Sequence, residues 1–162
     1  MHEVLLIDTS VFCRILRVEH KCTAAEHAAT LAELEALIVR PGIITNLLLP
    51  AATIYETGNH IAQNGNGTER RKAALRFVKR VQQAFDGQAP WTPTELPGLS
   101  QMRGWLAEFP DRATMGVGLG DLSIIKTFED LCGKTPNARV RIWSLDHHLS
   151  SYDRQPTGSL AG

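Results

Sequence analysis

Val4-Leu5-Leu6-Ile7-Asp8-Thr9-Ser10 is the stretch that decides the fold. Four consecutive apolar residues are typical of a strand that is buried on both faces, as in a parallel sheet. Asp8 follows at the carboxyl end of this strand, where open α/β sheets bind their ligands. Asp, Ser and Thr are also common helix N-caps, so the aspartate has a structural explanation beside the functional one.

Three further acidic residues stand at comparable places in the chain. Arg139-Val140-Arg141-Ile142-Trp143-Ser144-Leu145-Asp146 is a second strand-like run that ends in an aspartate. Asp121 opens a helical pattern after a glycine-rich loop, and Glu56 lies early in the helical pattern that follows another strand. Because such places share one rim of a parallel sheet, we expect Asp8 and these three acids to face one pocket.

Apolar periodicity predicts alternating helices and short strands, which indicates an α/β fold with a mostly parallel sheet flanked by helices. Thr23-Ala24-Ala25-Glu26 is a capping box that starts one helix, and Pro41-Gly42 ends it. We expect strands at 4–7, 43–49 and 140–145, a very short strand at 91–92, helices at 11–16, 24–38, 51–60, 68–85, 99–109 and 121–131, and irregular structure at 86–98 and 110–120.

Length and composition bound the function. The 162 residues, with 43% hydrophobic and 21% charged content, are ordinary for a globular protein. We expect one domain over residues 1–152 and a flexible tail at 153–162. No apolar run approaches the roughly 20 residues of a membrane helix. Cys13, Cys22 and Cys132 form no paired motif, so we expect reduced thiols and a cytoplasmic location.

The helix expected at 68–85 has an apolar and a basic face. Its apolar stripe is expected to be Ala74, Leu75, Phe77, Val78, Val81 and Phe85. The formal net charge of the chain is zero, so attraction to nucleic acid would have to come from a local patch or a bound metal. The basic face, with Arg76 and Lys79 as candidate RNA contacts, offers such a patch, although charged helix exteriors are also simply solvated.

Four converging carboxylates cannot remain close together without compensation, because like charges raise each other's pKa. Oxygen ligands without a nearby thiolate suit Mg²⁺ or Mn²⁺. A pair of such ions, about 3.5–4 Å apart, can stabilise the attacking and leaving oxygens of a phosphodiester displacement. The residues themselves therefore predict metal-dependent phosphoryl-transfer chemistry.

Four segments resemble, in order, the motifs of PIN-domain nucleases, and the resemblance extends from Val4 to about Tyr152. They are Leu6-Ile7-Asp8-Thr9-Ser10-Val11-Phe12, Ile54-Tyr55-Glu56-Thr57, Gly118-Leu119-Gly120-Asp121-Leu122-Ser123-Ile124-Ile125 and Trp143-Ser144-Leu145-Asp146-His147-His148-Leu149. The resemblance implies a Rossmann-like, three-layer fold and RNA cleavage by a metal-activated water. It also implies Asp8, Glu56, Asp121 and Asp146 as catalytic acids and metal ligands, with Thr9 and Ser10 in support.

Free-standing members of this family include VapC-type toxins, which are inhibited by a small antitoxin protein. The expected partners are therefore RNA, a small antitoxin and a second copy of the chain. The Pro-rich segment 86–111 departs from the most compact toxins. The alternative is a catalytically silent PIN-like module that binds RNA or protein. Phosphatases that begin with a similar strand need a second aspartate where this chain has Ser10.

Overall fold

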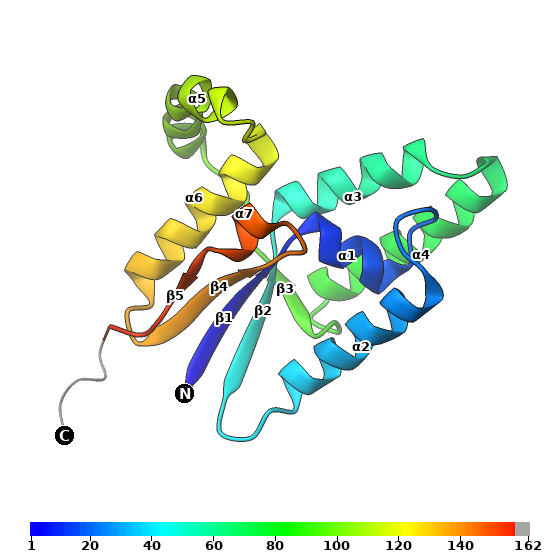
Figure 1. Cartoon of the computed structure of the whole chain (residues 1–162), viewed down its shortest axis with the longest axis horizontal. Coiled ribbons are helices and arrows are strands. Elements are labelled where there is room, and N and C mark those ends of the chain that lie inside the picture. Colours follow the sequence, from blue (N-terminus) through cyan, green and yellow to red (C-terminus); the bar gives the residue numbers. More distant parts are fainter. Residues whose placement is uncertain (158–162) are drawn as a thin grey trace.

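The computed structural model of the protein describes residues 1–157 and shows a five-stranded sheet between helices (Figure 1). β1 (His2–Ile7) is central, and the spatial order is β3-β2-β1-β4-β5. β2 (Ile44–Leu49), β3 (Trp91–Pro93) and β4 (Ala138–Trp143) continue the parallel pairing, whereas β5 (Asp153–Arg154) pairs antiparallel with β4. The parallel strands bring their carboxyl ends to one edge, as predicted.

Helices cover both faces of the sheet (Figure 1). They are α1 (Thr9–Leu16), α2 (Ala24–Ile38), α3 (Ala51–Gln63), α4 (Gly67–Phe85), α5 (Leu99–Thr114), α6 (Leu119–Lys134) and α7 (His147–Ser150). α1, α2 and α4 pack on one face, and α6 and α7 pack on the other. The three-layer α/β architecture predicted from the sequence is therefore confirmed.

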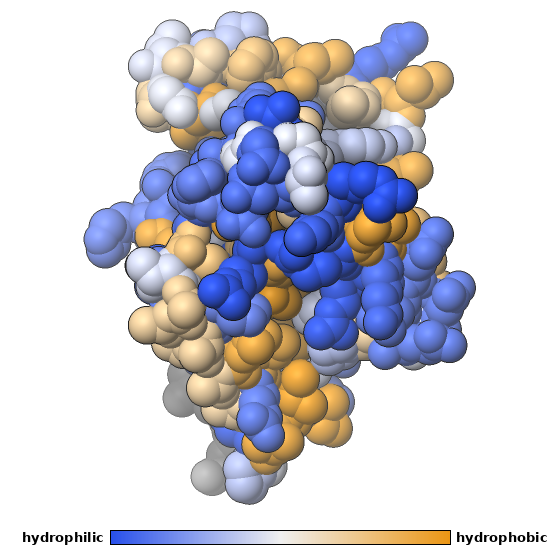
Figure 2. Space-filling model, turned by 90° about the vertical axis from the view of Figure 1, so that its right-hand side faces the viewer, coloured by the Kyte–Doolittle hydropathy of each residue, from blue (hydrophilic) through white to orange (hydrophobic). Residues whose placement is uncertain are grey.

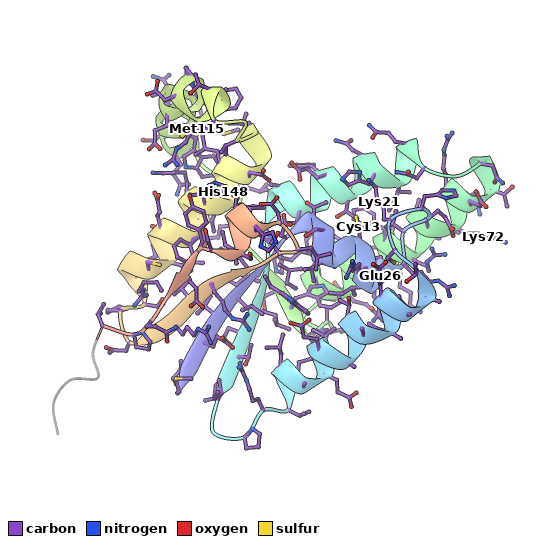
Figure 3. The ribbon with its side chains drawn as sticks, viewed as in Figure 1. Cys13, Lys21, Glu26, Lys72, Met115 and His148 are labelled. Atoms are coloured by element: carbon purple, nitrogen blue, oxygen red, sulfur yellow. The ribbon has the colours of Figure 1, made fainter. Side chains whose placement is uncertain are left out.

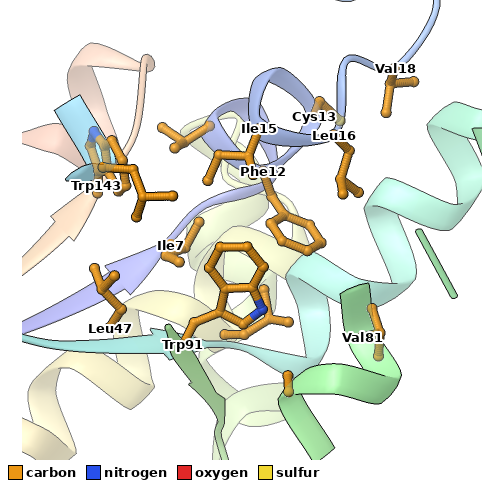
Figure 4. Packing of buried hydrophobic residues seen from close by; sticks show 14 of the residues in the cluster. Ile7, Phe12, Cys13, Ile15, Leu16, Val18, Leu47, Val81, Trp91 and Trp143 are labelled. Carbon is orange, nitrogen blue, oxygen red and sulfur yellow. The ribbon is translucent and has the colours of Figure 1, made fainter. Parts of the chain in front are cut away.

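The alternation of side chains along β1 divides the core in two. Leu5 and Ile7 point into the cluster beneath α1, α2 and α4, while Val4 and Leu6 point into the cluster beneath α6. In the first cluster the rings of Phe12 and Trp91 meet edge to face, with their centroids 5.5 Å apart (Figure 4). The predicted short strand at Trp91 thus carries a core residue, and it fixes the far edge of the sheet.

Helix α5 corrects one expectation. The sequence predicted irregular structure from Pro110 onward, but α5 continues through Pro110 to Thr114. Proline removes one helical hydrogen bond, yet α5 buries none of its residues, so the freed carbonyl can be hydrated. Trp105, in the middle of α5, is only half-buried and lines surface hollows.

The apolar stripe predicted for α4 is also partly wrong. The helix buries Ala73, Val81 and Ala84, whereas Leu75, Val78 and Phe85 are exposed. The small alanines allow α4 to pack closely, so the contact face is rotated away from the large apolar residues. A basic surface and an exposed apolar stripe consequently lie side by side on this helix.

At the carboxyl end, Asp153 and Arg154, which were expected to begin the flexible tail, form β5 instead. Arg154 ties this strand down by donating to the carbonyls of Cys132 (3.1 Å) and Thr135 (2.8 Å). The remainder of the expected tail, from residue 158, lies outside the described residues. In residues 1–157, no helix combines the length and the apolar character that crossing a membrane requires.

Candidate functional site

The four predicted acids line one hollow at the carboxyl edge of the sheet. Asp8, Glu56, Asp121 and Asp146 all border this cavity of about 330 Å³, which we call the acid pocket. Asp8 follows β1, Glu56 lies within α3, Asp121 lies in the first turn of α6, and Asp146 follows β4. Segments far apart in the sequence thus bring their carboxylates to the end of the central strands.

Asp8 is the most firmly held of the four, with 4% of its surface exposed. Its Oδ2 accepts hydrogen bonds from the hydroxyls of Ser10 (2.6 Å) and Ser144 (2.7 Å), and from the Ser10 backbone N–H at 3.3 Å. Asp8 is therefore the N-cap of α1 as well as an acid of the pocket. The structural and functional explanations of this residue are both compatible with its geometry.

Glu56 reaches the acid pocket from α3 because two neighbours allow it. The Thr9 hydroxyl donates to Glu56 Oε2 at 3.0 Å, which orients the carboxylate. Gly120 lies against the other oxygen: a Cβ atom at that position would stand 2.0 Å from Glu56 Oε1. Glycine is thus required where α6 begins if Glu56 is to keep this position beside Asp121.

Asp121 carries the clearest electrostatic signature of the site. Burial, together with the charges of Glu56, Asp8 and Asp146, raises its pKa from 3.8 to about 6. Within residues 1–157 no hydrogen-bond donor contacts its carboxylate. The pocket therefore contains more negative charge than its protein surroundings compensate.

Asp146 stands at the more open side of the acid pocket. Its Oδ1 accepts the backbone N–H of Leu149 at 3.0 Å, so it caps the short helix α7. Its own N–H donates to the Ser144 hydroxyl at 3.0 Å, which links it to the hydrogen bonds around Asp8. Ser144 thereby connects the two aspartates that follow the central strands β1 and β4.

Two cations, a histidine and a thiol complete the lining of the acid pocket, and Figure 3 labels Cys13 and Lys21 among them. Arg14, Lys21 and His60 line it together with Cys13. Burial, with the nearby charge of Lys21, lowers the pKa of His60. Burial raises the pKa of the Cys13 thiol to about 11, so near neutral pH it is protonated and a poor metal ligand.

The donor set suits a hard divalent cation, because it consists of carboxylate and hydroxyl oxygens. Gly120 supplies the space that the Glu56 carboxylate needs beside Asp121. In residues 1–157, however, no three acidic, histidine or cysteine side chains are close enough together to hold a metal ion. One oxygen each of Asp8, Glu56 and Asp146 is turned to a protein donor, which is the arrangement expected of carboxylates that repel.

The sequence did not identify three residues of this site. Ser144 stands within the fourth motif, but nothing in its spacing indicates that it bonds to Asp8. The role of Gly120 depends on Glu56, which is distant in sequence. Lys21 lies in an irregular segment and reaches the pocket through the tertiary fold. The two candidate RNA contacts, Arg76 and Lys79, line a different hollow.

Comparison with known proteins bears on the fold. No family model and no curated protein matches the chain. Among solved structures, FitAcB from Neisseria gonorrhoeae is similar, with a TM-score of 0.56 and 18% identity over 91% of each chain. FitAB bound to an IR36 DNA fragment is similar at TM-score 0.55 and 18% identity, over 91% of this chain and 89% of that one. The fold predicted from the PIN resemblance is therefore confirmed as the fold of this chain.

Proposed function

We propose that the chain is a divalent-metal-dependent endoribonuclease that hydrolyses RNA phosphodiester bonds at the acid pocket. The observation that carries this proposal is the convergence of Asp8, Glu56, Asp121 and Asp146 on one hollow in which their charge is not neutralised. A structural charge cluster would hold its counter-ions within the protein. This one fits a cation supplied from solution and an anionic substrate behind it.

The proposed metal is Mg²⁺ or Mn²⁺, held by the four acids of the pocket. When bound, it would lower the pKa of a water molecule and neutralise the scissile phosphate. The residues of the chain orient the ligands: Ser10 and Ser144 hold Asp8, and Thr9 holds Glu56. Lys21, at the rim, adds a positive charge that attracts the phosphate.

We further propose that residues from Met1 to at least Arg154 act as one nuclease domain and serve in the cytoplasm as the toxin of a toxin–antitoxin pair. The fold shared with FitAcB and FitAB supports this assignment. A small antitoxin and a second copy of the chain are the proposed protein partners. The exposed apolar residues around α5 support a protein partner, since such patches commonly mark interfaces; they are Tyr55, Leu96, Leu99, Met102 and Leu106.

The test is RNA cleavage by the purified chain with Mg²⁺, with Mn²⁺ and with EDTA. Asp8→Asn and Asp146→Asn should each reduce cleavage by about 100-fold or more, because loss of a ligand should exceed the 10- to 100-fold typical of outer-shell partners. Asparagine still caps a helix, so both variants should keep their fold. Asp111→Asn, an exposed acid on α5, is the matched control and should cleave as the wild type does.

The same assay separates the proposal from its alternative, a silent module on the same fold. Cleavage that continues in EDTA, after contaminating nuclease has been excluded, would contradict the metal mechanism. A chain that binds RNA but cuts none of a broad panel with either metal would favour the silent module. Ser144→Ala should reduce the rate by about tenfold if Ser144 only orients Asp8.

A further inference from the structure

A second hollow, of about 610 Å³, opens between α1, α2 and α4. Four cationic side chains line it, those of Arg17, Arg76, Lys79 and Arg80, and the only carboxylate among its lining residues is that of Glu19. We call this hollow the basic groove. The side of the molecule on which α4 lies shows hydrophilic residues gathered across its middle, with hydrophobic ones between them (Figure 2).

The cations of the basic groove lack a counter-charge. The Lys and Arg residues that form ion pairs lie elsewhere: Arg14, Arg40, Arg112, Lys126, Lys134, Arg139 and Arg141. In the described part of the chain, none of the four groove cations has a carboxylate oxygen within 4.0 Å. Positive charge is thus concentrated in the groove although the net charge of the chain is zero.

Arg76 has a structural task that its neighbours do not share. It donates to the carbonyl oxygens of Leu16 (3.4 Å) and Arg17 (3.2 Å), which are free because α1 ends there. Lys79 and Arg80 lie one turn further along α4 and are exposed, and neither donates to the backbone of α1. The side chains available to an incoming ligand are therefore those of Arg17, Lys79 and Arg80.

Helix α1 connects the basic groove with the acid pocket. Its residues Cys13 and Arg14 line the pocket, and Ile15 and Leu16, which follow directly, line the groove. The eight residues of α1 span about 12 Å, from the 1.5 Å rise per residue. Lys21, which is exposed and lacks an ion pair in the described residues, continues the positive charge to the rim of the pocket.

We propose that the basic groove binds the phosphate backbone of the RNA strand on one side of the scissile bond. This inference rests on the proposed function, which places that bond at the acid pocket. An acidic protein segment would also need apolar surface to cover, and of the three apolar residues that line the groove Ile15 and Leu16 are each 5% exposed, while Leu31 alone, at 38%, is open. A sugar-phosphate chain needs cations placed along its path, and the groove and Lys21 provide them.

The test is the binding of a fluorescein-labelled oligouridine, measured by anisotropy in EDTA over a range of salt concentrations. Lys79→Gln combined with Arg80→Gln should weaken binding by about five- to tenfold and flatten the salt dependence, because each lost phosphate contact removes about 0.7 from the log–log slope for single strands. Arg70→Gln combined with Arg71→Gln removes the same charge from α4 on its side toward α3. This control should bind as the wild type does.

The outcomes separate this inference from the proposed function. Equal affinities and salt slopes for the wild type and both double variants, in a chain that cuts RNA, would overturn the inference and leave the nuclease assignment intact. A specific loss in the Lys79→Gln/Arg80→Gln variant, in a chain that never cuts RNA with either metal, would support RNA binding at the groove and contradict the nuclease proposal. A loss of equal size in both double variants would also overturn the inference, since it would reflect net charge alone.

Discussion

The two ends of strand β1 hold their carboxylates in opposite ways. At the amino end, Glu3 is fully buried, and three arginines surround it. Arg141 Nε donates to Glu3 Oε1 at 2.9 Å, and Arg40 donates to Oε2 and also to the Thr45 hydroxyl. At the carboxyl end, Asp8 and its neighbouring acids have hydroxyl and backbone donors but, among residues 1–157, no comparable set of arginines.

The pKa directions express this difference. Burial alone would raise the pKa of Glu3, but hydrogen bonds from Arg40 and Arg141 outweigh it and hold the pKa below the ordinary value. Burial and neighbouring acids raise the pKa of Asp121 to about 6, and within residues 1–157 no arginine forms an ion pair with it. The charge of Glu3 is neutralised within the chain, whereas the charge in the acid pocket is not.

The largest effect on stability is expected from removing the charge of Glu3 at the amino end of β1. Glu3→Gln should lower the free energy of unfolding by about 3 kcal/mol, because it leaves the partly buried Arg40 and Arg141 without their counter-charge. Urea denaturation would measure the change. Glu33→Gln, an exposed acid on α2 without an ion pair in the described residues, is the control and should change it by less than about 0.5 kcal/mol. Equal losses in both would show that Glu3 contributes nothing specific.

Removing one charge from the acid pocket should change the free energy of unfolding by less, and in the opposite direction. In EDTA, Asp121→Asn should raise the free energy of unfolding by about 1 kcal/mol, because it removes a charge that its neighbours repel. The gain is smaller than the pKa shift alone would give, since Asp121 is half-buried and solvent screens part of the repulsion. The variant should also lose most of the rise in melting temperature that Mg²⁺ or Mn²⁺ gives the wild type. A destabilised variant would mean that the charge of Asp121 serves the fold.

The pH dependence sharpens the same comparison. Because the pKa of Asp121 is raised in the folded state, its contribution to stability is present below about pH 4 and is lost as the pH rises through about 6. The pKa of Glu3 is lowered, so its contribution is present above about pH 4.5 and is lost as the pH falls through the folded value. Difference curves against Asp121→Asn and Glu3→Gln, measured without metal, should therefore slope in opposite directions.

The smallest effect on stability is expected from Gly120→Ala. The new Cβ would displace the Glu56 carboxylate, so the rise in melting temperature with Mn²⁺ should shrink while the fold is retained. Gly133→Ala, in the same helix, meets no atom within 4 Å and should add about 0.5 kcal/mol through helix propensity. An unchanged metal response in the Gly120 variant would remove Gly120 from the site.

The local elements were predictable because their signals are local. The apolar run before Asp8 predicted β1, and the Thr23 capping box predicted α2, whose cap forms both expected hydrogen bonds. The convergence of the acids on one hollow followed from strand ends and from the ordered motifs. Their roles as metal ligands and catalytic groups remain predictions.

What the sequence left open depends on tertiary contacts. The partners of Glu3 come from positions 40, 139 and 141, so no short pattern distinguishes this acid from a surface one. The exposure of Leu75, Val78 and Phe85 depends on how closely the alanines of α4 approach their neighbours. The passage of α5 through Pro110 depends on the hydration of an exposed helix, which local propensity does not describe.

The reactivity of Cys13, which lines the acid pocket, reports how often this part of the molecule opens locally. Cys13 is 3% exposed and the pKa of its thiol is raised to about 11, so its thiolate can attack a disulfide reagent only when α1 opens locally. The half-buried thiol of Cys132, beneath the opposite face, reports a different region of the same molecule. A divalent ion bound by the acids should therefore slow the reaction of the Cys13 thiol far more than that of the Cys132 thiol. The rate at Cys13 then measures the local opening of the pocket.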